Sequence, residues 1–453
     1  MCIRDRTESG AGRQDPVHEG NGPAVDWGPE FRGAFTTSPG SRHSLCLAGT
    51  EDEPIRAPDP DIADRSIDRT IRGWEEWTEA FSWDGPWPEQ VLRSTLALKL
   101  LLYSPSGAIA AAATTSLPES TTVAKNWDYR YAWVRDLSYS VDAFLRFGLR
   151  EEPHAAVAWA LKALKRSTED GIAVFLTLEG DATDGVHRER AEGWRGLGPV
   201  FSGNQASGQL QLGVYADLIS IMRAYTADGN LLDGTSSDLL VHLADEACRT
   251  WQRKDSGMWE LPVARHYVSS KMGCWQALDA ACSLHDMGYV LPAKRTRRRW
   301  EKNKRLIRRW IDRHGWDERR GAYRMYKGSR ELDTSVLLHT VSGFDRGERM
   351  SRTIDVLRAE LGRGPLLYRY SGMEREEGAF TACAFWTVSA LACVGRVDEA
   401  RALMDELIDT VANDVGVMAE MVDPETGAFL GNLPQALSHL ALVQAASVIR
   451  ELT

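Results

Sequence analysis

One short segment, Asn126–Asp136, concentrates side chains that could bind a sugar. Its eleven residues include four aromatic rings, two aspartates and two arginines, and an apolar helical pattern, Leu137–Phe147, follows it. Aromatic faces cover the C–H face of a sugar, and charged groups beside them bind its hydroxyls. The segment therefore predicts a sugar-binding loop at the start of a helix. A buried aromatic cluster with one internal Arg–Asp pair is the alternative interpretation.

A second segment, Asp255–Pro262, could supply a catalytic carboxyl. Its Asp-Ser-Gly start is typical of a turn and its proline stops regular structure, so Glu260 is expected on a loop beside Trp259. A carboxyl that packs against an indole is desolvated, which raises its pKa and lets it hold a proton near neutral pH. The alternative is a surface glutamate that follows a packed tryptophan.

A third candidate carboxyl, Glu420, lies within the apolar stretch Val417–Val422. A carboxylate that is buried in such a stretch must be paired, hydrogen-bonded or functional. The alternative places Glu420 on the polar side of an amphipathic segment. The turn Asp423–Gly427 that follows is expected to carry solvated acidic groups.

Two further polar groups could contact a ligand. Arg369 lies between two tyrosines in Tyr368–Tyr370 and could hold hydroxyls, while the glutamates that follow, ending at Glu377, could equally form an exposed acidic turn. Gln209 and Gln211 form a weaker polar candidate near a predicted helix start.

These segments fall in the connections of a chain that is helical from Pro88 onward. The pattern Ala379–Val394 is apolar on every side, whereas Val397–Ile408 has one apolar and one acidic face. A buried helix followed by an amphipathic one is what an inner and an outer ring of helices require, and six such pairs would close an all-α toroid. The predicted spans are 88–104, 135–148, 152–166, 206–226, 236–252, 266–287, 292–313, 332–341, 347–361, 378–394, 397–412 and 433–451.

The N-terminal part differs in composition. Residues 1–62 are rich in Gly, Pro, Ser and acidic residues and are expected to be irregular. Residues 63–85 form a predicted linker with an amphipathic helix, Ile67–Phe81, and 86–453 form the main domain. We interpret residues 1–6 as a translated sequencing-adaptor remnant, which would leave the native N-terminus missing.

Composition excludes several classes of protein. The net charge of −10 argues against nucleic-acid binding, and no apolar run reaches the roughly 18 residues of a membrane span. A cytoplasmic location is therefore expected. The basic run Lys294–Arg309 is interpreted as the solvated face of a helix.

Metal and disulfide chemistry are not expected either. The seven cysteines contain no CxxC spacing, which predicts neither a disulfide framework nor a zinc site. His266, His285 and His439 are isolated, so no metal ligand is assigned. Oligomeric state is not predicted.

Taken together, the segments resemble glycoside hydrolase family 15, in particular its bacterial glucoamylases, glucodextranases and trehalases. The resemblance runs from about Pro86 to Ile449. Its motifs in this sequence are Gly107–Ala112, Thr114–Glu119, Asn126–Arg130, Trp133–Asp136, Gly203-Asn204, Gln209–Leu212, Gly257–Glu260, Ser270–Trp275, Glu377–Phe380, Ala419-Glu420, Asp423–Gly427 and Gly431–His439.

The resemblance implies an (α/α)6 barrel that hydrolyses α-glucosidic bonds from a non-reducing end with inversion. It implies that Glu260 is the general acid and Glu420 the general base, with carboxyls roughly 6.5–9.5 Å apart, and that no metal or cofactor is needed. The expected substrate is an oligosaccharide or disaccharide, with trehalose or short α-glucans favoured over starch. The predicted substrate-binding residues are Trp127, Trp133, Arg135, Asp136, Trp259, Arg369 and Glu377.

The sequence departs from the family pattern in four places. The N-terminal β-sandwich domain of this branch is expected to be truncated or missing. Met421 and Gly213 replace a common Gln and Asp, and Leu261-Pro262 replaces the usual Val-Arg. An inactive sugar-binding remnant is the alternative function, although both carboxyls are retained. A terpene cyclase is disfavoured because the chain has no Asp-Asp pair.

Overall fold

The computed structural model describes residues 36–41, 43, 54, 59–166, 172–183, 185–411, 413 and 415–453. Internal contacts divide the chain into two units, 1–81 and 82–453. The first contains helix α1 (Pro60–Glu79), which Asp59 caps by accepting a hydrogen bond from the Asp61 amide. The helix predicted at Ile67–Phe81 is therefore observed, and it begins and ends earlier than predicted. The suspected remnant 1–6 and most of 1–62 lie outside the described residues.

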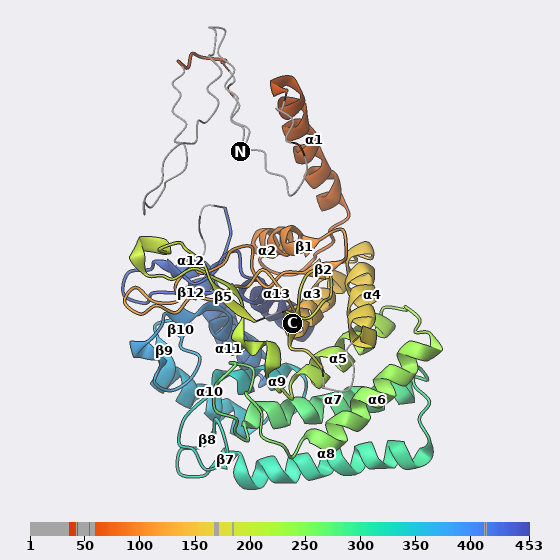
Figure 1. The fold of residues 1–453 in the computed structure, drawn as a ribbon. Coiled ribbons are helices and arrows are strands. Elements are labelled where there is room, and N and C mark those ends of the chain that lie inside the picture. The colour runs from red at the N-terminus through yellow and green to blue at the C-terminus, as the bar shows by residue number, and fades with distance from the viewer. Residues whose placement is uncertain are drawn as a thin grey trace, which may run out of the picture. The chain divides into compact units, whose positions relative to one another are not determined.

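The second unit is built from an inner and an outer set of helices (Figure 1). Contacts join α3 to α5, α5 to α7, α7 to α9, α9 to α11, α11 to α13 and α13 back to α3, so the inner set closes a ring. The inner helices are α3 (Val134–Arg146), α5 (Val214–Ala227), α7 (Val268–Asp286), α9 (Leu338–Val341), α11 (Thr381–Cys393) and α13 (Ala436–Leu452).

The outer helices pack on this ring from outside. They are α2 (Pro88–Leu101), α4 (Glu151–Arg166), α6 (Gly234–Thr250), α8 (Lys294–His314), α10 (Glu348–Leu361) and α12 (Val397–Val411). Every residue of α11 except the last is buried, whereas α12 buries only one of its faces. This arrangement is consistent with the predicted (α/α)6 barrel.

Two predicted helices differ from the observed ones. The span 206–226 begins as a helix only at Val214, because a 3₁₀ turn, Gln205–Gly208, and Gly213 precede it and glycine is a poor helix former. The span 332–341 is a 3₁₀ turn, Thr334–Leu337, followed by the single turn of α9.

Short antiparallel strands connect the helices. Two of these sheets lie at the candidate residues: β3 (Ala132–Trp133) pairs with β4 (Phe175–Leu176), and β12 (Met421–Val422) lies between β11 (Ala379–Phe380) and β13 (Phe429–Leu430). The others pair β1 (Leu102–Tyr103) with β2 (Ala108–Ile109), β5 (Val186–Arg188) with β6 (Phe201–Gly203), β7 (Trp316–Asp317) with β8 (Ala322–Tyr323), and β9 (Gly362–Arg363) with β10 (Leu366–Leu367).

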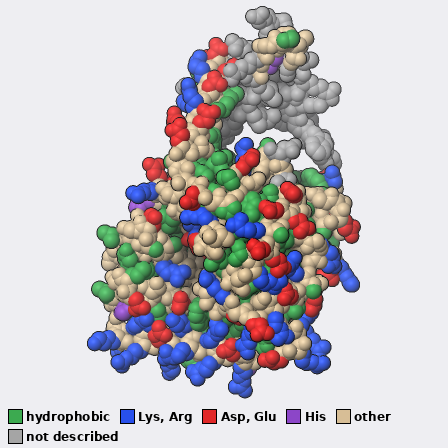
Figure 2. All heavy atoms as spheres, turned by 180° about the vertical axis from the view of Figure 1, so that it is seen from behind, with side chains coloured by type: hydrophobic (Ala, Val, Ile, Leu, Met, Phe, Trp, Pro, Cys, Tyr) green, Lys and Arg blue, Asp and Glu red, His purple; other side chains and the backbone are tan. Residues whose placement is uncertain are grey.

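The basic run of the sequence lies on α8. Its side chains Lys294, Arg295, Arg298 and Lys302 are exposed, while Trp300 on the opposite face is buried. Figure 2 shows lysine and arginine side chains gathered along the lower edge of the molecule. The prediction of a solvated face is therefore confirmed.

The described cysteines are free thiols, and three of them, Cys274, Cys282 and Cys383, are buried. In the described part of the chain, no three His, Cys, Asp or Glu side chains are grouped as metal ligands. Among the described helices, none has both the length and the apolarity that a membrane crossing requires.

Candidate active site

One pocket brings together residues that are far apart in sequence. Seven of the predicted site residues line it: Trp133, Arg135, Asp136, Trp259, Glu260, Arg369 and Glu420. Its other lining residues are Ala111, Tyr129, Met258, Phe380, Gln435 and Leu437. Trp127 and Glu377 are not among the residues that line it. The pocket thus holds both candidate carboxyls together with aromatic rings and two arginines, which is a combination that suits a sugar.

The loop that carries Glu260 holds this residue in a strained conformation. Its φ is 58°, in the left-handed region, where a residue other than glycine costs roughly 1–3 kcal/mol. Two contacts maintain the loop: Gln209 Nε2 donates to the Glu260 carbonyl at 2.9 Å, and the Leu261 amide donates to the Ser256 carbonyl at 3.0 Å. The strain is located at a candidate catalytic residue, as is common in active sites.

The carboxyl of Glu260 is held by an aromatic partner. Trp133 Nε1 donates a hydrogen bond to Glu260 Oε1 at 2.8 Å. Burial raises the pKa of Glu260, although Arg135 and the bond from Trp133 lower it in part. A carboxyl in this state can carry a proton that it later donates.

Glu420 is fully buried and lies one residue before β12. Its Oε2 has no hydrogen-bond partner among the described residues, and it lies against Gly431, where an added Cβ would stand 2.5 Å away. Burial and then the neighbouring Glu119 raise the pKa of Glu420 well above its usual range, while Arg369 and a hydrogen bond from Tyr129 oppose this effect. The alternative that places Glu420 on the polar side of an amphipathic segment is therefore wrong.

Arg369 reaches the pocket from a buried cluster of charges. Its Nε donates to Glu377 Oε1 at 2.6 Å, and its Nη2 donates to Glu119 Oε2 at 3.2 Å. Lys125 Nζ contacts Glu377 Oε2 at 2.8 Å. The Arg369 guanidinium also lies 5.5 Å from the centre of the Trp259 ring. Arg369 is therefore fixed in place by carboxylates behind the pocket.

Glu377 belongs to this cluster and is buried, whereas Glu374 and Glu376 are exposed. Burial alone would raise the pKa of Glu377, but Arg369 and Lys125 outweigh it and lower the pKa. Glu377 is thus not part of an exposed acidic turn. It holds Arg369 rather than lining the pocket.

The segment Asn126–Asp136 was interpreted either as a sugar-binding loop or as a buried cluster with an internal Arg–Asp pair. The pair Arg135–Asp136 at the start of α3 has features of both. Arg135 Nη2 lies 3.1 Å from Asp136 Oδ2, and Arg135 Nη1 donates to the Met258 carbonyl at 3.2 Å. Both side chains nevertheless line the pocket. Burial raises the pKa of Asp136 even though Arg135 lowers it. The segment forms an internal ion pair and also faces the cavity.

Trp127 contacts other residues instead of lining the pocket. Its carbonyl accepts hydrogen bonds from Asn432 Nδ2 at 2.9 Å and from the Ser116 amide at 2.8 Å. A hydrogen bond from its side chain lowers the pKa of Glu119. Trp127 therefore joins the Ser116 backbone, the Asn432 side chain and the buried carboxyl of Glu119.

Glu119 and Tyr129 belong to the site, although the sequence predicted no role for either of them. Burial raises the pKa of Glu119 to about 7, and this residue contacts Arg369 and influences Glu420. Tyr129 lines the pocket and packs edge-on against Trp133, with ring centroids 5.4 Å apart. Tyr129 hydrogen-bonds to Glu420 and Trp133 hydrogen-bonds to Glu260. The four-residue spacing of the two aromatic residues does not by itself predict these two bonds.

Comparisons with known proteins identify the family of the chain. Residues 86–447 match the model of the family described as "Glycosyl hydrolases family 15". A trehalase of Thermoplasma acidophilum is 32% identical over 394 residues, which cover 85% of this chain and 66% of that protein. A trehalase of Mycobacterium tuberculosis is 32% identical over 404 residues, which cover 86% of this chain and 59% of that protein. The chain thus spans less than two thirds of these relatives.

Solved structures show the same fold. A bacterial glucoamylase complexed with acarbose has a TM-score of 0.66 at 16% identity and covers 85% of this chain and 59% of that chain. A glycosidase in complex with glucose has a TM-score of 0.64 at 17% identity and covers 80% of this chain and 96% of that chain.

Proposed function

Because the chain belongs to glycosyl hydrolase family 15, we propose that it hydrolyses α-glucosides with inversion and releases glucose from the non-reducing end. The proposed substrate is trehalose, since the relatives at 30–32% identity carry the name trehalase. The observation that carries the proposal is the pocket that Glu260 and Glu420 both line.

In the proposed reaction, protonated Glu260 donates its proton to the glycosidic oxygen as the bond from that oxygen to C1 breaks. A water molecule attacks C1 from the opposite face, and Glu420 takes the proton that this water loses. Such a mechanism places the two carboxyls roughly 6.5–9.5 Å apart, which leaves room for the water. The raised pKa of Glu260 lets it carry the proton that this role requires.

Glu420 must be ionised in order to act as the base. Arg369 and the hydrogen bond from Tyr129 favour its carboxylate, whereas burial and a charged Glu119 oppose it. Removal of the charge of Glu119 would therefore favour the ionised form of Glu420.

The remaining residues are proposed to hold the terminal glucose. Arg135, Asp136 and Arg369 would bind its hydroxyls, and the rings of Trp133 and Trp259 would cover its apolar faces. Glu377 and Trp127 would act indirectly, by positioning Arg369 and Glu119.

The proposal is tested by following trehalose, maltose, isomaltose and starch with proton NMR. Inverting hydrolysis of α,α-trehalose is expected to release one β-glucose and one α-glucose from each molecule before mutarotation. Release of α-glucose alone would contradict inversion. Binding of these sugars by the folded protein without any hydrolysis would favour the inactive remnant instead.

A further inference from the structure

A buried carboxyl outside the catalytic pocket, that of Asp255, lies at the base of the loop that carries Glu260. Asp255 is 1% exposed and is not among the residues that line the pocket. Its amide donates to the Arg265 carbonyl and its carbonyl accepts from the Arg265 amide, each at 2.9 Å. Residues 255–265 therefore form a loop whose two ends are held together. The proposed mechanism gives Asp255 no role.

One oxygen of Asp255 joins three separate segments of the chain. Asp255 Oδ2 accepts hydrogen bonds from Ser270 Oγ at 2.7 Å, from the Leu212 amide at 3.1 Å and from the Gly257 amide at 3.3 Å. Ser270 belongs to α7, Leu212 precedes α5, and Gly257 is part of the loop itself. Removal of a buried acceptor is costly when it leaves buried donors without a partner. The carboxyl therefore attaches the loop to α7 and to the start of α5.

A buried lysine on α7 reinforces this attachment. Lys271 is fully buried, and its Nζ donates a hydrogen bond of 2.6 Å to the Arg253 carbonyl, two residues before Asp255. Burial raises the pKa of Asp255, and the charge of Lys271 is the largest effect that opposes this rise. Ser270 and Lys271, which are adjacent on α7, thus hold the side chain of Asp255 and the backbone just before it.

Glu260 depends on this attachment because only two residues separate it from Gly257. The Glu260 amide donates to the Gly257 carbonyl at 3.4 Å, and the Leu261 amide donates to the Ser256 carbonyl at 3.0 Å. These bonds close a tight turn in which Glu260 takes its left-handed φ of 58°. A left-handed backbone at a residue other than glycine persists only where the surrounding contacts fix it. The bond from the Gly257 amide to Asp255 is one of those contacts.

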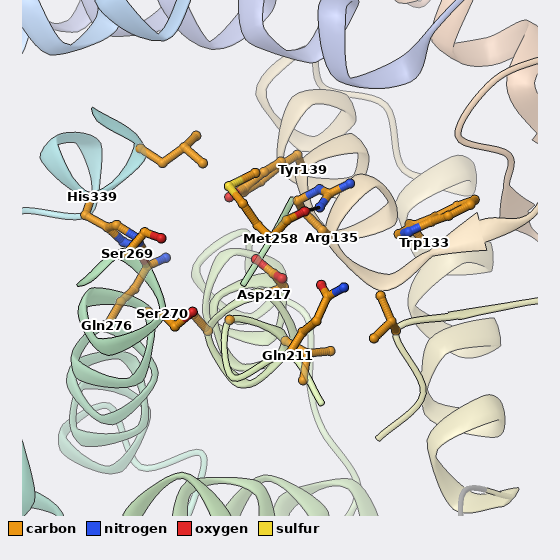
Figure 3. A pocket seen from close by; sticks show the side chains of 16 residues that line it. Trp133, Arg135, Tyr139, Gln211, Asp217, Met258, Ser269, Ser270, Gln276 and His339 are labelled. Atoms are coloured by element: carbon orange, nitrogen blue, oxygen red, sulfur yellow. Dashed lines mark hydrogen bonds between the residues drawn. The ribbon is translucent and has the colours of Figure 1, made fainter. Parts of the chain in front are cut away.

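The glucose-binding side of the pocket has an attachment of its own. Figure 3 shows Arg135 and Met258 side by side, and Arg135 Nη1 donates to the Met258 carbonyl at 3.2 Å. Arg135 is also paired with Asp136 at 3.1 Å, and both residues belong to α3, to which none of the three bonds of the Asp255 carboxyl runs. Loss of the carboxyl is therefore expected to displace Glu260, whose backbone is strained, and to leave Arg135 in place.

We propose that Asp255 is a positioning residue for the reaction. Its bonds to Ser270, Leu212 and Gly257 hold the loop in the conformation that presents the carboxyl of Glu260 to the glycosidic oxygen. Asp255 does not touch the substrate and acts through Glu260. The inference rests on the proposed function, in which Glu260 is the general acid.

Two substrates separate this role from a purely structural one. α-Glucosyl fluoride needs no protonation of its leaving group, whereas trehalose does. Asp255→Asn keeps an oxygen that can accept the three bonds but removes the charge, and Asp255→Ala removes the acceptor. We expect kcat for trehalose to fall about tenfold in Asp255→Asn and about 10²-fold in Asp255→Ala, while kcat for the fluoride stays within about threefold of the wild type.

Asp345→Asn is the matched control. Asp345 is also a buried carboxyl that holds a loop, because it accepts hydrogen bonds from Tyr323 Oη at 2.6 Å and from the Gly347 amide at 2.9 Å. It is not among the residues that line the catalytic pocket. This variant should leave the ratio of kcat for trehalose to kcat for the fluoride unchanged.

A double variant tests whether Asp255 acts through Glu260, and it does not depend on the folding of Asp255→Ala. In a Glu260→Gln background, Asp255→Asn should cause no further loss of trehalose hydrolysis, because the acid through which Asp255 acts is already absent. Equal losses on both substrates in Asp255→Asn, no loss on either, or a further tenfold loss in the Glu260→Gln background would overturn the inference. No hydrolysis of either substrate by the wild type would refute the proposed function instead, and with it the role of Asp255.

Discussion

Trp133 and Glu260 lie 127 positions apart in the sequence, and Trp133 Nε1 donates a hydrogen bond to Glu260 Oε1 at 2.8 Å. The ring of Trp133 also stacks on Phe175, with centroids 4.5 Å apart. Packing therefore fixes the indole, and the indole fixes the carboxyl. The aromatic segment that resembles a sugar-binding loop thus also orients the proposed general acid.

Trp133→Phe tests this relationship. The bond from Trp133 lowers the pKa of Glu260, so its loss is expected to raise that pKa and move the basic limb of the kcat/KM profile to higher pH. A carboxyl that is no longer oriented should also lower kcat, by about tenfold. Trp159→Phe is the control, because Trp159 Nε1 bonds to the Leu178 carbonyl away from the pocket. The same pH shift in both variants would argue against the specific role of Trp133.

The roles of acid and base can be separated with two substrates. Glu260→Gln and Glu420→Gln are each expected to lower trehalose hydrolysis by about 10²–10⁴-fold while the fold, monitored by circular dichroism, is retained. α-Glucosyl fluoride needs no protonation of its leaving group, so Glu260→Gln should keep most activity on it and Glu420→Gln should not. The control is Glu425→Gln in an exposed turn. The reverse pattern on the fluoride would exchange the two roles.

Glu119→Gln is expected to shift the acidic limb of the pH profile. Glu119 raises the pKa of Glu420, so removal of its charge should lower that pKa and extend activity to lower pH. The kcat/KM profile for trehalose measures the shift. Glu376→Gln is the control: Glu376 is exposed, so this variant should leave the acidic limb at the same pH. A limb that moves to higher pH would mean that Glu119 stabilises the ionised form of Glu420.

Glu377→Gln tests the charge cluster through stability. Because the pKa of Glu377 is lowered in the folded protein, its contribution is present above the pKa of the unfolded chain and is lost as pH falls through the folded pKa. The variant leaves Arg369 and Lys125 with one carboxylate fewer and should cost about 3–5 kcal/mol near pH 7.

Urea denaturation at pH 7 and at pH 4 measures this effect. The difference in unfolding free energy between the variant and the wild type is expected to shrink at the lower pH. An equal difference at both values would show that Glu377 stabilises the fold by packing and not by its charge.

Much of the helical framework could be predicted from the sequence. The all-round apolar pattern of 378–394 and the one-sided pattern of 397–412 correspond to α11 and α12, because helix burial is written into local periodicity. The spans 206–226 and 332–341 were predicted less well, since Gly213 and the 3₁₀ turn at Thr334–Leu337 follow from local backbone preferences that apolar spacing does not report.

The site was predictable only in part. Glu260 and Glu420 stand out because each carboxyl lies among apolar or aromatic neighbours, and the resemblance to a family supplied their roles. Glu377 was assigned to the substrate, yet it binds Arg369 from behind. Glu119 received no role, because its importance arises from Arg369 and Glu420, which lie hundreds of positions away.

The sequence alone determined the kind of helix at each position, the residues that could do chemistry and the family that they resemble, because these depend on residue type and on short-range spacing. Only the tertiary structure decided which of those residues meet. Closure of the ring from α13 to α3 lets residues from both ends of the chain line one pocket. The left-handed backbone of Glu260 and its bond to Trp133 depend on contacts between distant segments, which no local pattern contains.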